Sequence, residues 1–258
     1  PEEAKADIAR GLRAVAGYLA LNGGSLIGES SRAEFEWVLQ HSRIAAQFYD
    51  AYSRPLFDPE DPASTGGALR DRYMAQNIRW LLGTAYPGAK MVVWAHNGHV
   101  SKEVWGGAIP AMGWHLEQAF GEAYYAFGFD FERGGFQARH LDPELGDEDY
   151  GVLREFLVGP AREGSMARFL AEAATGDFVL DLRSTPRRGP VRDFFATPLP
   201  MANIGAGFAE AYLTQAWRSP VPAIDHYDGL IFIRETTRAR PNPSGQRGPI
   251  PRQTTPGG

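Results

Sequence analysis

The sequence Met91-Val92-Val93-Trp94-Ala95-His96-Asn97-Gly98-His99-Val100 decides the fold prediction. Its first half is short, β-branched and apolar, which is typical of a strand buried on both faces. A helical pattern over about residues 69–83 precedes it, and Tyr86-Pro87-Gly88 turns that helix directly into the apolar run. A helix, a turn and a buried strand in this order favour a mainly parallel central sheet layered by helices. We therefore expect an α/β fold.

The other elements are predicted from hydrophobic periodicity. Apolar residues spaced along one helix face indicate helices over residues 1–20, 31–52, 166–174 and 208–217. Alternating or continuous apolar runs indicate strands over residues 127–131, 178–182 and 229–233, with a turn at Gly134-Gly135. From residue 240 onward the chain holds five prolines and four glycines, which predicts disorder. The predicted organisation is one domain over residues 1–239 and a disordered tail over 240–258.

Composition narrows the function classes. The chain has 258 residues, with 26 Lys and Arg against 31 Asp and Glu and a net charge of −5, which argues against nucleic-acid binding. Cysteine is absent, which excludes disulfides, thiolate metal sites and a Cys nucleophile. No apolar run reaches the length of a membrane span, and the weak negative charge fits a cytoplasmic protein. The chain begins at Pro1 without a Met, so we expect that a preceding segment was removed.

His96 and His99 are the main candidates for catalysis. The predicted strand ends at His96, and ligands in open α/β sheets bind beyond the carboxyl ends of strands. Two imidazoles placed there could act as general base and general acid, or together bind a metal ion. The alternative is that one of them only hydrogen-bonds buried backbone. No compact set of further ligands lies nearby in the sequence, so we expect no metal and no cofactor.

The helix before this segment carries the candidate binding residues. Arg70, Met74 and Asn77 follow the spacing of one helix face, and Asp71 shares a neighbouring row with Met74. Charged and amide side chains along an apolar stripe indicate either the polar floor of a pocket or a buried ion-pair network. His226 precedes the last predicted strand and is a further candidate to reach the pocket.

Two of these stretches in combination resemble the erythromycin esterase family. The pattern R-D-x-x-M-A-x-N covers residues 70–77, and W-A-H-N-x-H covers residues 94–99. The stretches 112–116, 124–129 and 226–233 fit the same family. The resemblance implies hydrolysis of a small-molecule ester, with opening of a macrolide lactone and a role in antibiotic resistance. It further implies attack by a water molecule that a His base activates, without a covalent acyl-enzyme. His96 or His99 would then polarise the ester carbonyl or orient the water.

One departure from the family pattern affects this interpretation. The family carries a G-E-x-x-H-G type motif whose His is the expected base, whereas Gly28-Glu29-Ser30-Ser31 lacks that His and follows a helix. We therefore expect the fold to be incomplete at its N-terminus and the chain to correspond to the C-terminal two-thirds of a family member. Two alternatives to the esterase stay open. One is a non-catalytic ligand-binding module of the same fold, and the other is a metal-dependent hydrolase that uses His96 and His99.

Overall fold

The computed structural model describes residues 2–56, 58–105, 108–141, 150–209, 211 and 216–239. The predicted tail over residues 240–258 lies outside this part of the chain. A five-stranded sheet forms the centre, with the order β4-β3-β9-β5 and with β7 paired to β3. The strands are β3 (Phe127–His140), β4 (Leu153–Val158), β5 (Phe178–Asp181), β7 (Gly207–Phe208) and β9 (Gly229–Thr236).

Parallel pairing occupies the middle of this sheet. β3 and β9 run parallel, with Phe129 opposite Ile231, and β7 joins β3 in the same direction. β4 and β5 pair antiparallel to β3 and β9 at the outer positions. The strands predicted over residues 127–131, 178–182 and 229–233 are confirmed. The α/β class with parallel strands at its centre is also confirmed.

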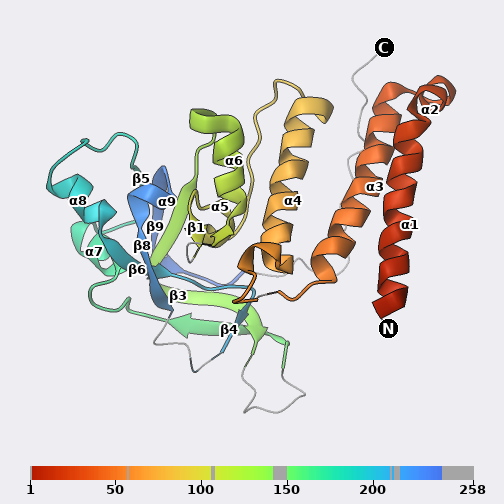
Figure 1. Ribbon diagram of the computed structural model, residues 1–258. Coiled ribbons are helices and arrows are strands. Elements are labelled where there is room, and N and C mark those ends of the chain that lie inside the picture. Colours follow the sequence, from red (N-terminus) through yellow and green to blue (C-terminus); the bar gives the residue numbers. More distant parts are fainter. Residues whose placement is uncertain are drawn as a thin grey trace.

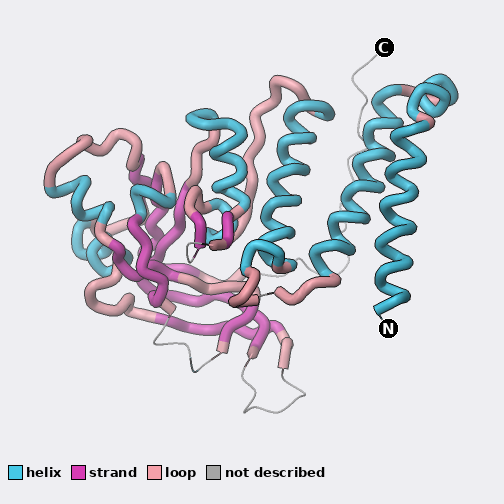
Figure 2. The backbone as a smooth tube through the Cα atoms, in the orientation of Figure 1, coloured by secondary structure: helices cyan, strands magenta, loops and turns pink. Residues whose placement is uncertain are grey.

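Helices lie on both sides of the sheet (Figure 1). α7 and α8 lie on one side of the strands, α4 and α6 lie on the other, and α1 and α3 form a hairpin beyond α4 (Figures 1 and 2). The helices are α1 (Glu2–Leu21), α2 (Gly23–Glu29), α3 (Arg32–Tyr52), α4 (Gly66–Trp80), α5 (Asn97–Val100), α6 (Met112–Phe120), α7 (Met166–Ala173), α8 (Pro190–Ala196) and α9 (Ala223–His226). Short turns of helix cover Pro62–Ser64, Leu81–Ala85 and Gly121–Ala123. No helix in the described ranges is long and apolar enough to cross a bilayer.

Side-chain caps explain where three of the helices begin. The hydroxyl oxygens of Ser31, Thr65 and Ser165 accept the backbone N–H three residues later, at the starts of α3, α4 and α7. Each cap satisfies one of the N–H groups that has no partner within its helix. The helices predicted over residues 1–20, 31–52 and 166–174 are confirmed by α1, α3 and α7.

Two small antiparallel ribbons complete the described fold. β1 (Val104–Trp105) pairs with β2 (Ile109–Pro110), and β6 (Pro198–Ala202) pairs with β8 (Trp217–Pro222). The β6–β8 ribbon is tied to β3 by its side chains and backbone. Trp217 Nε1 donates to the Phe131 carbonyl at 3.0 Å, and the Ala202 N–H donates to Asp130 Oδ1 at 3.1 Å.

The prediction of a strand buried on both faces at residues 91–95 is wrong. The segment is extended but pairs with no strand among the described residues, and Val92 and Trp94 are 93% and 84% exposed. A strand forms only where a neighbouring strand supplies its hydrogen-bond partners, and none of the described strands pairs with this segment. The turn that follows reaches β3 through a side chain instead, because Asn97 hydrogen-bonds both backbone groups of Phe129.

Two further predictions are corrected. The helix predicted over residues 208–217 is wrong, because Phe208 ends β7 and Trp217 begins β8, with residues 210 and 212–215 outside the described part. The turn predicted at Gly134-Gly135 is also wrong, since β3 runs straight through it. A Cβ at Gly134 would lie 2.2 Å from the Thr236 carbonyl oxygen, so this glycine permits close approach of β9.

The buried face of β3 is the polar one. Phe127, Phe129 and Phe131 alternate with three residues that are buried more deeply, namely Gly128, Asp130 and Glu132. Burial raises the pKa of Asp130 to about 7, against hydrogen bonds that lower it. Asp130 therefore enters the core in a form that is at least partly protonated near neutral pH.

Candidate functional site

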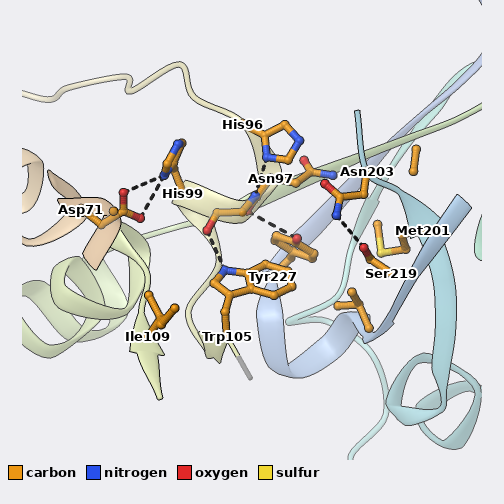
Figure 3. Close-up of a pocket in the computed structure, with 14 residues that line it drawn as sticks. Asp71, His96, Asn97, His99, Trp105, Ile109, Met201, Asn203, Ser219 and Tyr227 are labelled. Carbon is orange, nitrogen blue, oxygen red and sulfur yellow. Dashed lines mark hydrogen bonds and ion pairs between the residues drawn. The ribbon is translucent and has the colours of Figure 1, made fainter. Parts of the chain in front are cut away.

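A cavity of about 300 Å³ lies where five parts of the chain meet. The start of α4 contributes Gly67 and Asp71, and the segment 96–99 contributes both candidate histidines. Trp105 and Ile109 of the β1–β2 ribbon, Tyr227, and the β6–β8 ribbon form the remaining walls (Figure 3). Apolar side chains dominate the lining, and a few polar groups are set into it, which is the usual composition of a small-molecule site.

His96 begins α5 as its N-cap. Its Nδ1 accepts the backbone N–H of Gly98 at 3.0 Å, so a neutral ring carries its proton on Nε2. Burial and the neighbouring His99 lower the pKa of His96, against a smaller opposite effect of the Ile204 backbone. His96 is therefore neutral at neutral pH, and its Nε2–H is a donor that faces the Ile204 backbone and would have to turn toward a ligand in the cavity.

His99 has the opposite arrangement. Its Nδ1 lies 2.8 Å from Oδ1 and 2.9 Å from Oδ2 of Asp71, and the hydrogen bond goes to Oδ2. A carboxylate only accepts, so the proton of a neutral His99 is on Nδ1 and its lone pair is on Nε2. The guanidinium of Arg70 donates to that Nε2. His99 thus presents a proton acceptor, which Arg70 occupies in this arrangement.

Asp71 is fixed by the fold as well as by His99. Its side chain is 9% exposed, and its Oδ2 accepts the backbone N–H of Met112 at the start of α6 at 3.0 Å. The first turns of α4 and α6 therefore hold the carboxylate in position. A buried carboxylate that orients an imidazole through Nδ1 is a recurring arrangement in general-base catalysis.

The turn that carries the two histidines is anchored to the sheet. Asn97 Nδ2 donates to the Phe129 carbonyl at 2.7 Å, and its Oδ1 accepts the Phe129 N–H at 2.9 Å. Trp105 Nε1 donates to the Gly98 carbonyl at 2.8 Å, and the Tyr124 hydroxyl donates to the Val100 carbonyl at 2.7 Å. These contacts place both rings at the cavity without any backbone ladder on the segment before them.

The other predicted binding residues take different positions. Arg70 contacts His99, whereas Met74 packs against the core and Asn77 bonds Gln40 and Gln47 of α3. His226 is buried behind the cavity wall. Its Nδ1 lies 2.8 Å from the Ser101 hydroxyl, and its ring packs against that of Trp105. Of the seven candidates, Asp71, His96 and His99 line the cavity, Arg70 touches it through His99, and Met74, Asn77 and His226 lie outside its lining.

Several lining residues were not identified from the sequence: Trp105, Ile109, Met201, Asn203, Ser219, Val221 and Tyr227. Tyr227 follows His226 in a stretch that fits the family pattern, so it could have been found there. The others come from short ribbon strands that no motif or clear periodicity marks. Among the described residues, no group of three or more His, Asp and Glu side chains is placed to hold a metal ion.

Comparison with known proteins adds the family. The model of the erythromycin esterase family matches residues 2–236. The chain belongs to this family. The erythromycin esterase type II of Escherichia coli is 31% identical over 129 residues, which is 45% of this chain and 30% of that protein. The hydrolase YbfO of Bacillus subtilis, whose name is provisional, is 40% identical over 45 residues, or 17% of this chain and 10% of that protein.

Solved structures support the fold of this erythromycin esterase family member. A Bacillus cereus protein has a TM-score of 0.72 at 23% identity, over 92% of this chain and 53% of its own. A mutant of the erythromycin esterase EreC, solved in its open conformation, has a TM-score of 0.52 at 18% identity, over 90% of this chain and 53% of its own. The chain therefore spans about half of these structures and a third or less of the curated relatives.

Proposed function

We propose that this protein hydrolyses an ester, with a macrolide lactone as the first substrate to test. Family membership supports a hydrolase of the erythromycin esterase type. The observation that carries the proposal is the pairing of opposite tautomers at one cavity. His99 offers a lone pair oriented by Asp71, and His96 offers an N–H.

The roles follow from these tautomers. His99 Nε2 accepts a proton as a water oxygen attacks the carbonyl carbon, and His96 Nε2–H donates to the oxygen on which negative charge develops. The bond from the carbonyl carbon to the ester oxygen then breaks. The proton on His99 passes to that oxygen, which leaves as an alcohol, and the acid remains. Atoms balance with one water consumed and no acyl-enzyme formed.

Arg70 must move for this reaction to occur. Its guanidinium occupies the lone pair of His99 that the water needs. A shift of the guanidinium toward the ester carbonyl would free Nε2 and add a second donor at the developing oxyanion. The same contact favours the second candidate function. With Arg70 held in place, the cavity would bind a ligand without cleaving it.

Hydrolysis is tested directly by incubating the protein with erythromycin and with 4-nitrophenyl octanoate. We expect a macrolide product heavier by one water, or release of nitrophenolate, in the wild type. His99→Asn should lower kcat by about 10³-fold, and His96→Asn by about 10²-fold or more. His41→Asn is the matched control, because His41 lies on α3 against Trp37 and away from the cavity.

The outcomes separate the candidates. Cleavage of the octanoate with unchanged erythromycin rejects the macrolide substrate and retains the esterase. Full activity in both His96→Asn and His99→Asn rejects the assigned roles. A folded wild-type protein that binds erythromycin and cleaves neither compound overturns the hydrolase proposal in favour of the ligand-binding module.

A further inference from the structure

We propose that Asn203 and Ser219 form a second recognition point in the cavity, which binds a hydroxyl group on an otherwise apolar ester. This inference rests on the proposed function and specifies its substrate class. It is carried by the geometry of the β6–β8 ribbon, by the unused hydrogen-bonding capacity of the pair, and by its position across the cavity from the histidines.

The ribbon brings the two side chains to the same wall. Met201 lies opposite Ser219 and Leu199 opposite Val221 in the antiparallel register, so Met201, Ser219 and Val221 share one face. The register shifts between Met201 and Ala202. The extra residue there lies on β8, between Trp217 and Ser219. Asn203 follows two residues after Met201, just beyond β6, with its N–H on the Ala216 carbonyl at 2.9 Å.

This wall is rigid, because β3 holds the ribbon at both of its strands. The Ala202 N–H and Trp217 Nε1 each donate to β3, at Asp130 Oδ1 and at the Phe131 carbonyl. Trp217 and Met201 are 2% exposed. A ligand that meets Asn203 and Ser219 therefore meets groups already in position, which lowers the entropic cost of binding.

The pair has one internal hydrogen bond and capacity for more. Asn203 Nδ2 donates to the Ser219 Oγ at 2.6 Å. The structure gives the Ser219 O–H proton and the Asn203 Oδ1 no partner among the described residues. One group donates and the other accepts, and both line the cavity. A ligand hydroxyl also donates one hydrogen bond and accepts another, so it matches the pair.

The position of the pair across the cavity defines the rest of the ligand. Asp71 and His99 lie at one side and Asn203 with Ser219 at the other, and His96 lies above the space between them (Figure 3). Trp105 and Tyr227 supply the surface between the two polar ends, and Ile109 and Met201 line the cavity beside those ends (Figure 3). A substrate with its ester at the histidines thus places an apolar chain against this surface and a hydroxyl at the ribbon.

The cavity volume sets the probes. About 300 Å³ is at the lower end of the range of small-molecule sites. A medium-chain acyl group is a suitable occupant, so the probes are methyl octanoate, methyl 6-hydroxyoctanoate and methyl 8-hydroxyoctanoate. Binding is measured by titration calorimetry in the His99→Asn protein, where turnover does not interfere. Hydrolysis of the same esters is measured separately with the wild type.

We expect at least one hydroxylated ester to bind about five- to tenfold more tightly than methyl octanoate, the size of one or two net hydrogen bonds. Ser219→Ala and Asn203→Ala should each remove most of this preference. Ser219→Thr, which keeps a hydroxyl, should retain it. Ser42→Ala is the control, because its hydroxyl bonds the Leu39 carbonyl within α3, away from the cavity.

Equal affinity for all three esters, or a preference that survives both alanine variants, overturns the inference. A preference that depends on the pair, in a protein whose wild type hydrolyses none of the esters, overturns the proposed function and leaves the recognition point standing. Rates that fall in Ser219→Ala with an unchanged preference would show a merely structural role, which also overturns the inference.

Discussion

Replacing Asp71 by Asn tests the central feature of the proposed mechanism. The amide has the shape of the carboxylate, and its oxygen at the Oδ2 position can still accept the Met112 N–H. Its NH₂ group then takes the Oδ1 position, 2.8 Å from His99 Nδ1, where it can donate but cannot accept. If that NH₂ faces the ring, the His99 proton moves to Nε2, where it meets the guanidinium of Arg70. The variant therefore removes the lone pair that the attacking water requires.

The expected magnitudes differ for stability and for catalysis. Loss of a hydrogen bond to a charged group costs about 1.5–3 kcal/mol, and a value near the lower end is expected because the His99 side chain is 29% exposed. For a chain of this size that lowers Tm by about 3–6 °C. The same change in the serine-protease triad lowers kcat by about 10⁴, so we expect about 10³ here, or about 4 kcal/mol of barrier.

The assay combines urea unfolding, kcat on the best ester and ¹⁵N NMR of the imidazoles. In the wild type, His99 should show its proton on Nδ1 and His96 on Nε2, and Asp71→Asn should move only the His99 proton. Asp50→Asn is the control. Asp50 on α3 accepts a hydrogen bond from Tyr73 on α4, the helix that also carries Asp71, but Asp50 does not line the cavity. If kcat in Asp71→Asn stays within about threefold of wild type, or if His99 keeps its tautomer, the reasoning is refuted.

Three further variants test the supports of the site. Asn97→Ala should lower the free energy of unfolding by about 2 kcal/mol in urea, because it removes two hydrogen bonds to β3; an unchanged midpoint would contradict the anchoring role. Asp130, with its pKa raised to about 7, holds in the folded state a proton that the unfolded chain releases near pH 4. As the pH rises from about 4 to about 7, the free energy of unfolding of the wild type should therefore fall by up to about 4 kcal/mol relative to that of Asp130→Asn. If the two curves of stability against pH run parallel, this reasoning is wrong. Gly113→Ala should cost about 3 kcal/mol or more, because its Cβ would lie 2.1 Å from the Val100 carbonyl oxygen, whereas Gly17→Ala in α1 should not destabilise.

The success of the fold prediction depended on how local each signal is. α3 and α7 have caps and periodicity within their own sequences, so residues 31–52 and 166–174 sufficed to find them. β9 and β5 are short apolar runs that pair with neighbouring strands, β9 with β3 and β5 with β9. The run 91–95 has the same composition but pairs with no described strand. A strand depends on its neighbour as much as on its own residues, and one sequence does not reveal the neighbour.

The candidate site divides in the same way. Asp71, His96 and His99 lie in two sequence motifs, so all three could be identified from the sequence. The two motifs are separated by roughly 15 residues of sequence or more, and the fold brings them into contact. Asn203 and Ser219 lie at a ribbon of uninformative composition, and the strand pairing that brings them together has no sequence signal. Asn77 and Arg70 share one helix face, yet one bonds α3 and the other His99. A shared helix face therefore did not mean a shared site.

The two histidines show why residue type alone could not assign their roles. In both rings, the hydrogen-bond partner of Nδ1 decides whether Nε2 donates or accepts a hydrogen bond. A backbone N–H on Nδ1 makes His96 a donor at Nε2, and a carboxylate on Nδ1 makes His99 an acceptor there. The first contact is local, two residues along the chain, while the second comes from a helix that ends before the turn begins. The H-x-x-H spacing is silent on both, so exchanging the partners on Nδ1 should exchange the roles without moving either histidine in the sequence.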